Sequence, residues 1–134
     1  MSLTTKTFER GENLFEEGEP GREAYLIKKG YVSIWRIEGG QRVDLATHCE
    51  GEIVGEMALI DNTTRSATVT AEDSVEVEVI SNDDLQNMLS RAPEPLAAIL
   101  HQLMESIRCS NDLVEMYASL VKGSDLNRTK IGPV

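Results

Sequence analysis

The chain has 134 residues, of which 40% are hydrophobic and 4% aromatic, and its 13 Lys and Arg against 23 Asp and Glu give a formal net charge of -10 at pH 7. This length suffices for one domain with its own core, and the apolar content argues against a disordered chain. The negative charge repels polyanions, so we expect no direct binding to nucleic acid, and an anionic ligand needs a local group of donors.

Cysteine and histidine are scarce. Cys49 and Cys109 lie far apart in the sequence, which indicates neither a disulfide framework nor a zinc site. His48 and His101 are the only histidines, so we expect no metal, and the same count argues against a metal-dependent enzyme of the cupin type. No apolar run reaches the roughly 18 residues of a spanning helix, and no signal peptide is recognisable. We therefore expect a cytoplasmic protein without a membrane partner.

Residues 8–80 consist of short apolar runs separated by glycines, which predicts an all-β region. Gly39 and Gly40 separate two such runs and predict a tight hairpin, because paired glycines accept the positive φ of these turns. Residues 75–79 alternate apolar and charged side chains, as in a half-buried strand. We interpret the earlier glycines as turn residues rather than ligand contacts: Gly11, Gly18, Gly21 and Gly30.

The periodicity changes from strand to helix at Ser81. Ser81 and Asp84 have the spacing of a capping box, so a short helix is predicted from there to about Ser90. Strands followed by helices along the chain indicate an α+β fold, with a β-barrel or roll first and the helices after it.

A long amphipathic helix is predicted after Pro93 and Pro95, which suit a first helical turn. Apolar side chains recur at spacings of four and three until about Gly123, and the polar residues 110–112 leave an interruption open. This stripe either packs back on the roll or pairs with a second copy of the chain, with Ser110 as a polar position that sets the register. The stripe comprises Leu96, Leu100, Leu103, Ile107, Ser110, Val114, Tyr117 and Val121.

A short helix-forming run, residues 56–60, follows Gly55 within the strand region. A glycine there lets a ligand approach the backbone, and the amides of a helix start attract an anion. Arg65 and Ser66 come next, and a guanidinium matches two phosphate oxygens at once. These residues predict a site for one phosphodiester, where Glu56 accepts a hydrogen bond from a ribose hydroxyl.

The run from Gly55 to Ile60, then four residues, then Arg65 to Val69, resembles the phosphate-binding cassette of the cyclic-nucleotide-binding domain family. That family includes the regulatory subunits of cyclic-AMP-dependent kinase, the catabolite activator proteins and cyclic-nucleotide-gated channels. The glycine-marked residues 11–34 resemble its first strands, and the likeness spans residues 8–121. The implied organisation is a jelly-roll barrel with a short cassette helix at 8–80, C-terminal helices at 81–122 and a flexible tail at 123–134.

The resemblance implies a regulatory domain, not an enzyme, that binds cyclic AMP or cyclic GMP and moves its C-terminal helices in response. It implies that Glu56 binds the ribose 2′-hydroxyl and Arg65 the exocyclic phosphate oxygens, and that the amides of Ala58 and Ser66 complete the cradle. We favour cyclic AMP because Arg65 followed by Ser66 resembles the catabolite-activator version. The predicted ligand-binding residues are Gly55, Glu56, Met57, Ala58, Arg65, Ser66 and Ala67.

Some positions depart from the family pattern. Asn62 and Thr64 replace the glycine and proline usual in kinase-type cassettes, which predicts a different loop conformation. A helix residue often caps the base in the family, and the candidates here are Leu103, Met104, Ile107 and Arg108.

No helical bundle before the roll and no DNA-binding module after Val121 is recognisable, so a sensor fragment of a transcription regulator remains an alternative. A second alternative is a degenerate domain that binds no ligand and acts in protein contacts. The presence of both Glu56 and Arg65 argues against the degenerate domain.

Overall fold

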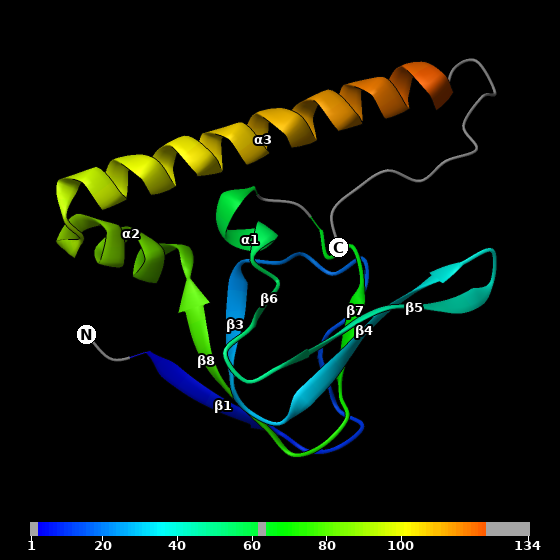
Figure 1. Ribbon diagram of the computed structural model, residues 1–134. Helices are drawn as coiled ribbons and strands as arrows, with labels where there is room; N and C mark the ends of the chain where they lie inside the picture. The colour runs from blue at the N-terminus through cyan, green and yellow to red at the C-terminus, as the bar shows by residue number, and fades with distance from the viewer. Residues whose placement is uncertain (1–2, 62–63, 123–134) are drawn as a thin grey trace.

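Two antiparallel sheets of four strands each enclose the core in the computed structural model (Figure 1). The structure describes residues 3–61 and 64–122, with side chains described up to residue 110. The first sheet has the order β1 (Thr4–Phe8), β8 (Val75–Ser81), β3 (Glu23–Lys29) and β6 (Ile53–Val54), and the second the order β2 (Asn13–Phe15), β7 (Thr68–Ala71), β4 (Tyr31–Glu38) and β5 (Gln41–Cys49). This arrangement confirms the predicted jelly-roll fold, although β1 begins at Thr4, before residue 8, where we placed the start of the roll.

Alternation along each strand turns one row of side chains into the core. In β8, Val75, Val77 and Val79 are buried, while Glu76 and Glu78 between them are half-buried. The predicted half-buried strand is therefore confirmed.

The hairpin predicted at the paired glycines joins β4 to β5. Gly39 and Gly40 have φ values of 59° and 80°, and two consecutive positive φ values are typical of a type I′ turn. The register that follows places Ile34 opposite Ala46, and Val32 opposite His48. Residues two apart on a strand share a face, so Ala46 and His48 of β5 point to the same side.

Over the two ranges that the structure describes, three helices complete the fold: α1 (Met57–Ile60), α2 (Asn82–Arg91) and α3 (Glu94–Lys122). The predicted capping box begins α2, because the Asp84 amide donates to Ser81 Oγ at 3.1 Å and the Ser81 amide donates to Asp84 Oδ2 at 2.9 Å. The helix α3 runs without a break through residues 110–112 and passes over α1 (Figure 1).

The apolar stripe of α3 does not pack on the roll as far as its side chains are described, up to residue 110. Its first four apolar members, Leu96, Leu100, Leu103 and Ile107, are 47%, 37%, 54% and 39% exposed. The interpretation of these residues as core packing is therefore wrong, and pairing with a second copy is the alternative that stays open. The side chains of Val114, Tyr117 and Val121, and the predicted tail at 123–134, lie outside the described residues.

In the part of the chain that the structure describes, no helix combines the length and the apolar character needed to cross a bilayer.

Candidate functional site

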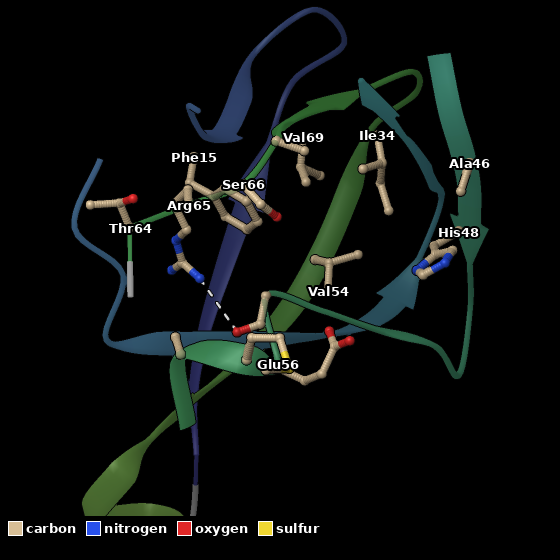
Figure 2. A pocket seen from close by; sticks show the side chains of 14 residues that line it. Phe15, Ile34, Ala46, His48, Val54, Glu56, Thr64, Arg65, Ser66 and Val69 are labelled. Atoms are coloured by element: carbon tan, nitrogen blue, oxygen red, sulfur yellow. Dashed lines mark hydrogen bonds between the residues drawn. The ribbon is translucent and has the colours of Figure 1, made fainter. Parts of the chain in front are cut away.

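All seven residues predicted to bind a ligand line one cavity of about 350 Å³, a size within the range of small-molecule sites (Figure 2). The cavity is lined on one side by residues of β4 and β5 and on the other by residues 54–58 and 64–67. Its walls are formed by Phe15, Ile34, Ala46, His48, Val54, Gly55, Glu56, Met57, Ala58, Thr64, Arg65, Ser66, Ala67 and Val69.

A glycine with left-handed backbone connects β6 to α1. Gly55 has a φ of 75°, which an L-residue adopts only with strain, and Glu56 is then the N-cap of the short helix α1. The amide of Ala58, which the resemblance assigns to the phosphate, donates to the Gly55 carbonyl at 3.2 Å. The Ser66 amide has no backbone acceptor among the described residues. Of the two predicted cradle amides, therefore, only that of Ser66 has no backbone bond to break when a ligand binds.

The guanidinium of Arg65 is buried in the wall of this cavity, with only 8% of the residue exposed. Its Nη2 donates to the Glu23 carbonyl at 2.8 Å, and its Nη1 makes a long hydrogen bond of 3.4 Å to the Gly55 carbonyl, drawn as a dashed line in Figure 2. Its Nε is buried without a hydrogen-bond partner among the described residues. Arg65 therefore has unused donor capacity in a place that water reaches poorly.

Two glycines and an aromatic ring leave just enough space for this guanidinium. A Cβ atom on Gly21 would lie 2.5 Å from Arg65 Nε, and one on Gly55 would lie 2.6 Å from Arg65 Nη1. The ring of Phe15 lies below the guanidinium, with 4.0 Å between Cζ and the ring centroid, which is a cation–π contact.

Gly21 has no positive φ and lies in no turn, so its interpretation as a turn residue is wrong. The feature that requires a glycine there is the close approach of Arg65. The other three glycines of that set, Gly11, Gly18 and Gly30, do have positive φ values, as the turn interpretation predicts.

No carboxylate forms an ion pair with Arg65 among the described residues. Burial lowers the pKa of Arg65, and the nearby Tyr25, Glu23 and Glu19 act in the opposite direction. Arginine nevertheless stays protonated at neutral pH. The cavity wall therefore contains a fixed positive charge that, within residues 3–61 and 64–122, donates hydrogen bonds to backbone carbonyls alone, and an anion would compensate that charge.

Glu56 supplies hydrogen-bond acceptors to the cavity, whereas Arg65 supplies donors. It lies at the cavity, exposed, and its carboxylate has no hydrogen-bond partner among the described residues (Figure 2). An ionised carboxylate only accepts hydrogen bonds, so Glu56 suits a ligand hydroxyl. Ser66, half-buried beside Arg65, adds a hydroxyl at the anion end.

Seven lining residues were not predicted. The β4–β5 hairpin brings three of them to the cavity: Ile34, Ala46 and His48. The signal in the sequence was the spacing of two between Ala46 and His48, which places both on one face of a strand. Phe15 gave no such signal, because its contact with Arg65 is distant in sequence.

The four candidates for capping the base do not line the cavity: Leu103 and Ile107 are exposed, Met104 is half-buried, and Arg108 bonds to α1. Thr64 lines the cavity and bridges to Pro20, whereas Asn62 lies outside the described residues.

No group of three or more His, Cys, Asp or Glu side chains is placed to hold a metal ion within the described residues.

Comparisons with known proteins agree with this geometry. The family model described as "Cyclic nucleotide-binding domain" matches residues 5–92, more than half of the chain. The chain is 31% identical over 113 residues to the "Cyclic AMP receptor protein" of Thermus thermophilus, covering 81% of this chain and 52% of that protein. It is 33% identical over 95 residues to a "cAMP-dependent protein kinase regulatory subunit" of Candida albicans, covering 71% of this chain and 20% of that protein. The chain thus spans about half the length of the first relative and about a fifth of the second.

Solved structures show the same fold. The EAL enzyme Bd1971 in its halfsite-occupied form aligns with a TM-score of 0.79 and 32% identity, over 82% of this chain and 99% of that chain. Its cAMP-bound and cGMP-bound forms align with TM-scores of 0.63 and 0.64 and identities of 29% and 27%, over 93% of this chain and 34% of each of those chains. With the family model and these relatives in agreement, this chain belongs to the cyclic nucleotide-binding domain family.

Proposed function

We propose that the chain is a sensor domain that binds a cyclic purine nucleotide, with cyclic AMP preferred, and carries out no chemistry on it. The observation that carries this proposal is the buried Arg65, a positive charge without a carboxylate partner among the described residues, in the wall of a cavity of ligand size. A cyclic phosphodiester has one negative charge, which matches one arginine.

The rest of the cavity fits the other parts of such a ligand. The phosphate lies at Arg65 and Ser66, where the guanidinium exchanges its long bond to the neutral Gly55 carbonyl for a shorter one to a negatively charged phosphate oxygen. The ribose 2′-hydroxyl donates to Glu56. The base lies against the apolar walls supplied by Ile34, Ala46, Val54 and Val69.

The preference for cyclic AMP is supported by the relatives, which are named as a cyclic AMP receptor and as cAMP-dependent kinase subunits. The structural neighbour Bd1971 has been solved with cAMP and with cGMP, so the fold itself accepts both bases. We also propose that this domain makes no direct contact with nucleic acid, given its net charge of -10.

We propose further that ligand binding is coupled to α3 through the last turn of α1. From α3, Nε and Nη2 of Arg108 both donate to the Ile60 carbonyl, at 2.9 and 2.8 Å, and from α2 the Asn82 side chain donates to the Leu59 carbonyl at 3.2 Å. Leu59 also packs with Ala24 and Ile80 in a small apolar cluster. A shift of α1 at the ligand would change both sets of bonds, and so bias the position of α3.

Finally, we propose that the exposed stripe of α3 pairs with that of a second copy. The spacing of four, three and four from Leu96 to Ile107 is that of coiled-coil core positions, and Ile99, 56% exposed, lies on the same side. Exposed apolar side chains in such a row are typical of an interaction surface.

Replacing Arg65 tests the binding site. Arg65→Ala leaves a buried phosphate without its charge partner, so we expect binding of the preferred nucleotide to weaken about 30- to 150-fold, the equivalent of about 2–3 kcal/mol. Isothermal titration with cyclic AMP and with cyclic GMP measures both affinities. The matched control is Arg10→Ala, an exposed arginine outside the cavity, which should bind like the wild type. Wild-type affinity in Arg65→Ala would exclude the assignment, and a wild type that binds neither nucleotide would favour the degenerate domain.

Replacing Arg108 tests the coupling. Spin labels at Lys6→Cys and Ala98→Cys, in a chain whose Cys49 and Cys109 are serine, report the distance between β1 and α3. We expect cyclic AMP to shift the distance distribution, and Arg108→Ala to reduce that shift at least by half, because α1 loses its bonds to α3.

The control for the coupling experiment is Arg91→Ala, an exposed arginine at the end of α2, which should keep the full shift. A full shift in Arg108→Ala as well would contradict the proposed route.

Replacing Leu103 tests the dimer. We expect the wild type to sediment as a dimer at tens of micromolar and Leu103→Glu as a monomer, because a charge in an apolar helix pair is costly. Gln102→Glu, an exposed neighbour off the stripe, should remain dimeric. A monomeric wild type would end this part of the proposal.

A further inference from the structure

We propose that His48 contacts the base of the bound nucleotide and contributes to the choice between adenine and guanine. This inference rests on the proposed function. It adds to the proposed site a residue, His48, to which the sequence analysis assigned no part in ligand binding. Figure 2 shows His48 across the cavity from Arg65, and the structure places it in the lining.

The position of His48 follows from the strand register. His48 and Ala46 share one face of β5, and Ala46 lies opposite Ile34 on β4. Arg65 and Ser66 occupy the anion end of the cavity and Glu56 the hydroxyl position. The β4–β5 wall is therefore what remains for the base.

His48 is the one side chain of that wall with hydrogen-bonding groups. The other described lining side chains of β4 and β5, Ile34 and Ala46, are aliphatic. Two further lining residues, Val54 of β6 and Val69 of β7, are aliphatic as well. An aliphatic wall accepts either purine, because both bases have the same flat shape and differ only in their polar edges. To distinguish adenine from guanine, this wall therefore needs a group that makes hydrogen bonds. The imidazole of His48 is such a group, because it can both donate and accept them.

The imidazole has unused hydrogen-bonding capacity. Its Nδ1 is buried and has no partner among the described residues. Its Nε2 lies 4.0 Å from Glu52 Oε2, too far for a hydrogen bond, while Glu52 Oε1 accepts from the Cys49 amide at 3.0 Å. Neither ring nitrogen is therefore committed to a hydrogen bond within the described residues. Nδ1 is too deeply buried to meet a ligand in this conformation, so Nε2 is the atom that can bond a base without breaking an existing hydrogen bond.

The test compares two ligands and one variant. Isothermal titration of the wild type and of His48→Leu with cyclic AMP and cyclic GMP yields four affinities. Because one hydrogen bond is lost with one base only, we expect the variant to bind the preferred nucleotide about 3- to 10-fold more weakly, and the ratio of the two affinities to change by the same factor. His101→Leu, at an exposed histidine on α3, is the control and should leave the ratio unchanged.

Three results overturn the inference. Unchanged affinities in His48→Leu show that the ring makes no useful contact, and an equal loss with both nucleotides shows that it does not read the base. A wild type that binds neither nucleotide overturns the proposed function and this assignment with it, which separates that failure from the other two. If thermal unfolding shows that His48→Leu does not fold, His48→Ala removes the same hydrogen bond and carries the same expectations.

Discussion

The guanidinium of Arg65 is a buried positive charge without an ion-pair partner among the described residues, and the surrounding structure is arranged to accommodate it. Phe15 lies under the guanidinium at 4.0 Å and is itself stacked on Tyr25, with ring centroids 6.0 Å apart. The guanidinium leaves no room for a side chain at positions 21 and 55, where the chain has Gly21 and Gly55. Burying a charge is costly unless it is compensated, and carbonyl oxygens compensate only part of that cost. An anion bound at Arg65 would offset the remaining cost, and the proposed site would therefore favour a charged ligand over a neutral one.

The short helix α1 lies between the cavity that contains Arg65 and the helices α2 and α3. The first residues of α1 line the cavity, whereas the carbonyls of its last two residues, Leu59 and Ile60, accept hydrogen bonds from Asn82 on α2 and Arg108 on α3. Because α1 has only four residues, a movement at its cavity end would reach its other end, which is the basis of the proposed coupling to α3. Arg108 also pairs with Glu105 one turn earlier on α3, which orients its side chain.

Features that depend on neighbouring residues were predictable from the sequence. The paired glycines predicted the hairpin, and the spacing of Ser81 and Asp84 predicted the capping box. The cassette motif identified seven residues that all line the cavity. Features that depend on distant contacts were not. A glycine that makes room for a side chain looks the same in sequence as one that makes a turn, so Gly21 was misinterpreted. An apolar stripe likewise has the same periodicity whether it faces the core or a second chain.

The central claim is that Arg65 binds the phosphate of a cyclic nucleotide, and a crystal structure of the chain with cyclic AMP tests it most directly. The account predicts a phosphate oxygen within about 3 Å of a guanidinium nitrogen, in the range of charge-assisted hydrogen bonds, with the nucleotide inside the cavity. A nucleotide bound elsewhere, or with its phosphate away from an Arg65 that keeps its bonds to the Glu23 and Gly55 carbonyls, would contradict the account.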